Sequence, residues 1–160
     1  MIILGIDPGS ARIGYGVIKK EKGFQMIDCG IIGTDRKKSE EQILENAQKL
    51  ARLIKKYRPA LIGLEKIYFS KNVKTGIAVA QSRGALLLEI AKHGLPVKEL
   101  SPSEVKLAVA GYGLADKKAV AKMVKLTLNL PLDSLKKYDD ATDALAIAIA
   151  AANTIDRFKV

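Results

Sequence analysis

The first eighteen residues, Met1-Ile-Ile-Leu-Gly-Ile-Asp7-Pro-Gly-Ser-Ala-Arg-Ile-Gly-Tyr-Gly-Val-Ile18, decide the fold. A short apolar run ends in the carboxylate of Asp7, and an apolar run bounded by turn residues is typical of a buried strand. The Pro-Gly-Ser that follows predicts a turn, because proline fixes φ and glycine permits positive φ. A second apolar run, Ile13 to Ile18, completes a hairpin with an aspartate at the tip of its first strand.

Asp7 has two interpretations at this point. A charge is costly inside a sheet, but the end of a strand opens on solvent, so the carboxylate can act there. Gly14 and Gly16 remove side chains beside it, which lets a metal, a phosphate or a backbone come close. The alternative is that Asp7 only forms the turn, since aspartate before Pro-Gly is ordinary turn chemistry.

The following residues extend the hairpin into an α/β fold. Phe24 to Thr34 predicts a third strand and therefore an antiparallel meander. Apolar residues at helical spacing predict a helix over residues 39–58. Ala60 to Leu64 is another short apolar run, which ends in Glu65. A strand that returns after a helix predicts a parallel crossover beside the first strand, so Glu65 is expected at the same sheet edge as Asp7.

The second half of the chain predicts helices and one short strand, over residues 97–100. Helices are expected up to about residue 93 and over residues 102–110, 117–128 and 140–157. The last of them is apolar nearly all round, which is typical of a helix packed against a sheet. The helix before residue 93 is expected to face the core through Ile77, Ala80, Gly84, Leu87, Leu88 and Ala91. We find no internal repeat and no Gly/Ser/Pro-rich linker, so residues 1–160 predict a single domain.

Composition narrows the class of protein. The net charge of +10 points to a polyanionic partner, most often nucleic acid, or else to a lysine-rich surface that only aids solubility. The longest apolar run, Ala144 to Ala152, is far shorter than the ~20 residues of a membrane-spanning helix. The N-terminus lacks the basic region of a signal peptide, and Cys29 is alone, which excludes a disulfide framework. We therefore expect a cytoplasmic protein with no membrane partner.

Two further acids stand at the start of the last helix. Asp140 and Asp143 are three residues apart and share one helix face. Asp139 or Asp140 can serve as an N-cap, but capping does not explain Asp143 as well. With Asp7 and Glu65 they make four carboxylates, each at the end of a buried element. Such oxygen-rich clusters suit Mg²⁺ or Mn²⁺, and two ions roughly 3.5–4 Å apart support phosphodiester hydrolysis.

Four motifs carry a family resemblance: Ile6-Asp-Pro-Gly-Ser10, Glu65 after an apolar strand, Gln81-Ser-Arg-Gly84, and Asp140-Ala-Thr-Asp-Ala-Leu-Ala146. Over essentially its whole length the chain resembles the RuvC family of crossover (Holliday) junction endodeoxyribonucleases. The resemblance implies an RNase H-like fold, that is, a mixed sheet of an antiparallel meander plus parallel strands, flanked by helices. It also implies that all 160 residues form one nuclease domain.

The same resemblance implies function and site. It assigns catalysis and metal binding to Asp7, Glu65, Asp140 and Asp143, with two Mg²⁺ ions per site and Mn²⁺ able to substitute. Some family members have histidine at the position of Asp140, and the family's Gln-Ala-Arg-Gly is Gln-Ser-Arg-Gly here. The implied enzyme is a homodimer that resolves four-way DNA junctions by symmetric paired nicks in recombination and repair, alongside a branch-migration complex.

Basic and aromatic residues are the expected DNA contacts. By the resemblance, Lys106 and Lys117 match lysines near the scissile phosphate, and Tyr68 matches an aromatic that helps to open the junction. Tyr68 stacks on a base in this interpretation and packs in the core in the alternative. A further group on one helix either binds phosphates or forms a solvated face: Lys118, Lys122 and Lys125.

The sequence also predicts where two copies meet. The helix from Val73 to His93 carries apolar residues beyond one narrow stripe, including Val79, Leu86 and Ile90, so this helix is the candidate dimer interface, and the resemblance implies the same because the family's dimer uses the corresponding helix. One alternative is a different RNase H-like nuclease, and another is a DNA-binding module without catalysis. A phosphotransferase of the actin or sugar-kinase kind also begins with an Asp-x-Gly hairpin, but it needs two such domains.

Overall fold

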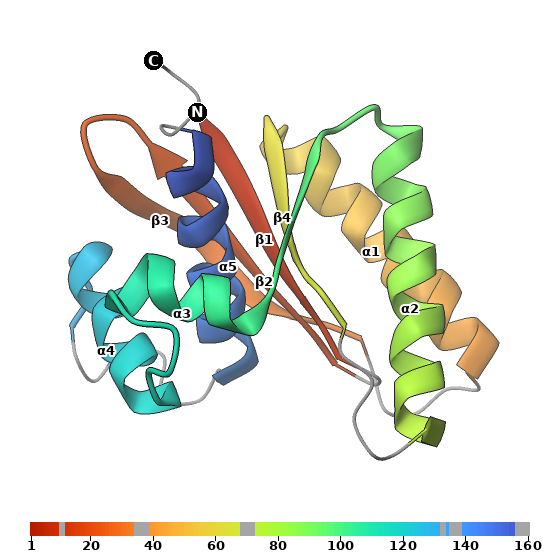
Figure 1. The fold of residues 1–160 in the computed structure, drawn as a ribbon. Coiled ribbons are helices and arrows are strands. Elements are labelled where there is room, and N and C mark those ends of the chain that lie inside the picture. The colour runs from red at the N-terminus through yellow and green to blue at the C-terminus, as the bar shows by residue number, and fades with distance from the viewer. Residues whose placement is uncertain (10–11, 34–38, 68–72, 132–133, 135–138, 156–160) are drawn as a thin grey trace.

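The fold is seen in a computed structural model that describes the chain except for residues 10–11, 34–38, 68–72, 132–133, 135–138 and 156–160. Five strands form one mixed sheet in the order β3-β2-β1-β4-β5 (Figure 1). The strands are β1 Ile2–Pro8, β2 Ile13–Lys20, β3 Phe24–Ile32, β4 Leu61–Glu65 and β5 Val97–Leu100. The helices are α1 Ser39–Tyr57, α2 Val73–Lys92, α3 Pro102–Ala110, α4 Lys117–Thr127 and α5 Asp139–Ile155.

The sheet has the predicted topology. Strands β1, β2 and β3 pair antiparallel as a meander, and β4 and β5 add to the other side of β1 in parallel. The predicted mixed sheet and the crossover through α1 are therefore confirmed. None of the helices in the described part of the chain is both long and apolar enough to cross a membrane.

Helices cover the two faces of the sheet unequally (Figure 1). Side chains alternate between the faces along β1, so Leu4 and Ile6 pack in the same cluster as Leu50 of α1 and Leu86 of α2. Ile3 faces the other way and packs with α3, α4 and α5. Residues 5 and 7 share the orientation of Ile3, and this alternation aims Asp7 at the α5 side.

Glycines on β1 and β2 let α5 lie directly on the sheet. A Cβ atom at Gly5 would stand 2.1 Å from the carbonyl oxygen of Ala144, and one at Gly14 would stand 2.1 Å from that of Asp140. No side chain other than hydrogen fits at these distances. The glycines beside Asp7 were expected to admit a metal, a phosphate or a backbone. In the structure it is the backbone of α5 that comes close to them.

The predicted core face of α2 is wrong. Ile77 and Leu88 are 51% and 61% exposed, whereas Leu86 and Ile90 are fully buried against the sheet. Apolar residues occur all around this helix, so their periodicity does not say which side meets the sheet. Leu86 and Ile90 therefore belong to the core, and only the exposed side of α2 stays available for the dimer contact that the sequence predicts on this helix.

Candidate active site

Two parallel strands bring Asp7 and Glu65 to one sheet edge. Ile6 of β1 pairs with Leu64 of β4, and each acid is the next residue along its strand. Because side chains alternate, both carboxylates leave the sheet on the face that α5 covers. The crossover prediction thus placed both acids correctly.

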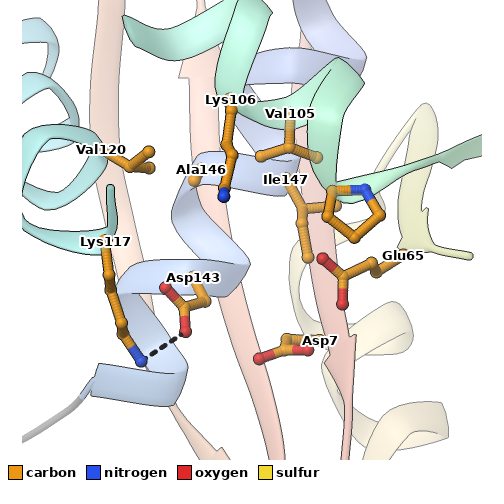
Figure 2. A pocket seen from close by; sticks show the side chains of 10 residues that line it. Asp7, Glu65, Val105, Lys106, Lys117, Val120, Asp143, Ala146 and Ile147 are labelled. Atoms are coloured by element: carbon orange, nitrogen blue, oxygen red, sulfur yellow. Dashed lines mark ion pairs between the residues drawn. The ribbon is translucent and has the colours of Figure 1, made fainter. Parts of the chain in front are cut away.

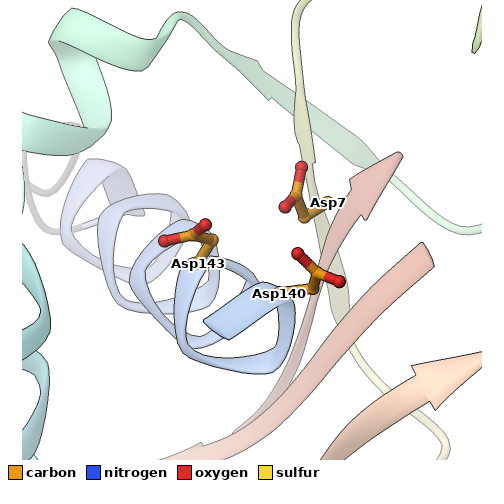
Figure 3. A group of neighbouring side chains, drawn as sticks. All are labelled: Asp7, Asp140 and Asp143. Atoms are coloured by element: carbon orange, nitrogen blue, oxygen red, sulfur yellow. The ribbon is translucent and has the colours of Figure 1, made fainter. Parts of the chain in front are cut away.

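The first turns of α5 supply the other two acids. One carboxylate oxygen each from Asp7, Asp140 and Asp143 lies within 4.8 Å of the other two, and Figure 3 shows the three side chains as neighbours between β1 and the start of α5. All three residues are partly buried. Glu65 is not part of this close group, but it lines the same pocket as Asp7 and Asp143.

The pocket holds about 210 Å³ and has an acidic floor, two lysines and an apolar wall. Figure 2 shows Asp7 and Glu65 on the sheet side and Asp143 on α5 opposite them. Lys106 of α3 and Lys117 of α4 also line it. The apolar wall consists of Pro102, Val105, Val120, Ala146 and Ile147. Sequence reasoning did not foresee this wall, because these residues look like ordinary core positions of three separate helices.

The acids repel one another. Burial, followed by repulsion from Glu65, Asp143 and Asp140, raises the pKa of Asp7 from 3.8 to about 7. Burial and the charge of Asp143 raise the pKa of Glu65. Carboxylates crowded in this way are stabilised when a cation joins them, so the donor set fits a hard divalent metal.

Lys117 partly compensates the negative charge. Its Nζ lies 3.0 Å from Oδ2 of Asp143, the ion pair drawn in Figure 2, and this hydrogen bond raises the pKa of Lys117. The lysine stands at the start of α4, where Asp116 accepts the Ala119 N–H at 2.7 Å as N-cap. The cap fixes where α4 begins and therefore where Lys117 projects.

The remaining expected contacts lie outside this pocket or outside the described residues. Lys118 and Lys122 are exposed on α4, and Lys125 is half-buried on the same helix. None of these three lysines lines the pocket. Tyr68 falls in a segment that the structure does not describe, so its role stays a prediction.

The Gln81–Gly84 motif lies on α2, away from the pocket. Ser82 is buried, and Arg83 pairs with Glu99 of β5 at 2.8 Å between Nη2 and Oε2. The motif thus ties α2 to the edge strand of the sheet. The sequence alone does not indicate this role, because Glu99 lies sixteen residues beyond Arg83 in the chain.

Comparison with known proteins agrees with this geometry. The family model described as crossover junction endodeoxyribonuclease RuvC matches residues 3–151. The chain belongs to the RuvC family. A curated relative of that description from Roseiflexus sp. (strain RS-1) is 45% identical, over 91% of this chain and 87% of its own. Another from Synechococcus sp. (strain CC9311) is 46% identical, over 93% of this chain and 96% of its own.

A solved family structure matches the whole fold. Thermus thermophilus RuvC in complex with Holliday junction substrate superposes with a TM-score of 0.88, at 25% sequence identity, over 99% of this chain and 97% of that one. The mixed sheet and its flanking helices are therefore the RNase H-like fold of this nuclease family, as predicted from the sequence.

Proposed function

We propose that this chain is a metal-dependent endonuclease that resolves four-way DNA junctions by paired nicks in recombination and repair. The observation that carries the proposal is the convergence of Asp7, Asp140 and Asp143 within 4.8 Å, in a chain of net charge +10. The relatives are nucleases by name, and the T. thermophilus relative is described with a junction substrate. Residues 1–160 then act as one nuclease domain.

The four acids form the metal site in this proposal. Asp7, Asp140 and Asp143 hold divalent metal, and Glu65 completes the ligand set from the neighbouring strand. We propose two Mg²⁺ ions, with Mn²⁺ able to substitute, because the donors are all hard carboxylate oxygens. When bound, such ions activate a water and stabilise the leaving oxygen of a phosphodiester. The raised pKa of Asp7, caused by burial and then by repulsion from the other three acids, supports this site.

The lysines hold the DNA backbone. Lys106 and Lys117 face the pocket from α3 and α4, so a phosphate above the acids meets a cation on that side. Lys117, which pairs with Asp143 in the metal-free protein, would be available to the phosphate when the acids hold metal. Further phosphates bind Lys118, Lys122 and Lys125, which supply affinity without reading sequence. Tyr68 stacks on a base at the crossover.

A homodimer would supply the second cut. The exposed side of α2 carries a seam at alternating spacings of four and three residues, which is the heptad pattern of helix pairing: Ile77, Gln81, Gly84, Leu88 and Ala91, all exposed. A Cβ at Gly84 would meet nothing within 4 Å, so a partner helix can approach closely there. We place the dimer contact on this seam, with branch-migration proteins as further partners.

One incubation series tests the function. A synthetic four-way junction, a plain duplex and an RNA–DNA hybrid are each incubated with the protein, with Mg²⁺, with Mn²⁺ and with chelator. Paired nicks in the junction alone, and only with metal, are expected. Preferred cutting of the hybrid would favour another RNase H-like nuclease, and binding without strand breaks would favour a non-catalytic module.

The dimer has its own test. Leu88→Glu places a charge in the exposed α2 seam, so it should give a monomer in sedimentation velocity and should uncouple the two nicks. Leu44→Glu, at an exposed leucine of α1, is the matched control and should stay dimeric. A wild-type monomer at micromolar concentration, with junction present, would contradict the proposed assembly.

A further inference from the structure

The loop between α3 and α4, residues 111–116, is anchored at both ends. Gly111 ends α3 at a φ of 87° and donates its N–H to the carbonyl of Leu107. Ala115 is fully buried, and Asp116 caps α4. The loop therefore holds its outward side chains in a fixed place.

Those outward side chains are apolar. Tyr112 is 54% exposed and Leu114 is 92% exposed, the highest value among the large apolar side chains in the part of the chain that the structure describes. A lone exposed leucine is common on protein surfaces. What distinguishes Leu114 is its anchored loop and the position of that loop beside the acidic pocket.

The loop joins the two helices that bring lysines to the pocket. Lys106 of α3 and Lys117 of α4 line the acidic pocket, as Figure 2 shows. Leu114 precedes Lys117 by three residues, so their Cα atoms are at most about 10 Å apart. A DNA strand advances about 3.4 Å per nucleotide. The extended side chain of Lys117 adds roughly 6 Å between that Cα and a phosphate at its Nζ, so a strand whose phosphate lies in the pocket would pass the loop within about five nucleotides.

Charge selects DNA as the occupant. Cations flank the loop on both helices, with Lys106 before it and Lys117 and Lys118 after it. The acid within the loop, Asp116, is held as a helix cap. Proteins that bind DNA in the minor groove frequently insert apolar side chains between base steps, and an exposed leucine and tyrosine flanked by lysines are suited to such a contact.

We propose that Tyr112 and Leu114 form an apolar wedge in the minor groove of a junction arm, within about five nucleotides of the scissile phosphate. The wedge rests on the proposed nuclease function and adds a contact to it. It differs from the lysine contacts in kind, because it touches bases and sugars rather than phosphates.

Leu114→Ala is the decisive variant. We expect it to bind the junction roughly tenfold more weakly, because most of the buried apolar surface of one leucine is lost. The slope of log K against log[salt] should stay unchanged, since no phosphate contact is removed. The melting temperature should also stay unchanged, because the side chain is exposed in the free protein.

Binding is measured by fluorescence anisotropy in an Asp7→Asn background, which keeps the junction uncut. Leu44→Ala is the matched control, since Leu44 is 60% exposed but lies on α1, on the opposite face of the sheet. As a second readout, 2-aminopurine placed at successive positions within about five nucleotides of the cut should brighten on binding at the position next to the wedge. That signal should fall with Leu114→Ala and not with Leu44→Ala.

The outcomes separate the wedge from the function. Equal affinity of wild type and Leu114→Ala, with wild type still cutting junctions, would overturn the wedge alone and would leave the loop to a protein partner. A weaker affinity with a shallower salt slope would also overturn it, because the loop would then act on phosphates. Failure of the wild-type protein to cut any junction would instead refute the nuclease function.

Discussion

Replacing Asp7 with asparagine should make the metal-free protein more stable while it abolishes cleavage. Burial and the repulsion of three other acids raise the pKa of this carboxyl group to about 7. Ionised Asp7 therefore destabilises the folded state, and Lys117 offsets only part of this effect, so a bound cation is needed to offset the rest. Asparagine keeps the shape and removes the charge.

The size of the effect follows from the pKa shift. A rise from 3.8 to about 7 corresponds to roughly 4 kcal/mol at about 1.4 kcal/mol per pKa unit. The sign is that of a raised carboxyl pKa. The folded state binds the proton more tightly than the unfolded chain, so wild type loses stability as the pH rises from about 4 to about 7 and stays at the lower value above that.

The assay is a pair of thermal melts, wild type and Asp7→Asn, followed by circular dichroism from pH 4 to pH 8 in chelator. The difference in melting temperature should be near zero at pH 4 and roughly 8–16 °C in favour of the variant at pH 8. Saturating Mg²⁺ should raise the melting temperature of wild type by mass action and that of the variant much less. The difference in melting temperature between the two proteins should therefore narrow.

Asp139→Asn is the matched control. Asp139 is an exposed acid in the first turn of α5, next to Asp140, and its charge interacts favourably with the helix dipole. Its loss should therefore lower stability slightly, by at most about 1 kcal/mol. The two aspartates should thus respond in opposite directions. Metal-free wild type at pH 8 as stable as Asp7→Asn, or equal stabilisation of both by Mg²⁺, would refute the electrostatic account of the site.

Three further changes test other parts of the molecule. Gly14→Ala drives a Cβ to 2.1 Å from the Asp140 carbonyl oxygen, so the free energy of unfolding measured in urea should fall by about 3 kcal/mol or more. Gly23→Ala, whose Cβ would meet nothing within 4 Å, is the control, and equal effects of the two changes would contradict the close contact. Neutralising Lys122 and Lys125 together should make the slope of log K against log[salt] shallower by up to about 2, and an unchanged slope would mean that they form only a solvated face. Tyr68→Leu should lose most junction cleavage, with binding weakened by about 1–3 kcal/mol. Tyr68→Phe should stay active, because stacking needs the ring and not the hydroxyl, and a fully active Tyr68→Leu would exclude the stacking role.

The acidic constellation was predictable because each acid sits where a local pattern changes. Asp7 and Glu65 end apolar runs, and Asp140 with Asp143 opens an apolar helix. The topological rules for a strand, a helix and a returning strand then place the two strand acids at one edge. The close approach of α5 to the sheet could not be predicted from these local patterns, because it depends on contacts between Gly14 and a helix that begins about 126 residues further along the chain.

The orientation of α2 shows where sequence reasoning failed. Both sides of this helix are apolar, so Leu86 and Leu88 are equally good core candidates by periodicity. The side of the helix that carries Leu86 packs on the sheet face formed by Leu4 and Ile6. The ion pair between Arg83 and Glu99 of β5 adds a second contact between α2 and the sheet. Neither contact can be inferred from residues that lie close together in the sequence.

The sequence by itself determined the strands, the crossover and the four acids, since these depend on local periodicity, turn residues and the handedness of chain connections. Only the tertiary structure decided which face of α2 is buried and that Lys117 pairs with Asp143. It also decided that Leu114 projects from an anchored loop beside the pocket. The physical reason is that burial and ion pairing are set by partners far away in the chain, and a local pattern carries no information about which partner arrives.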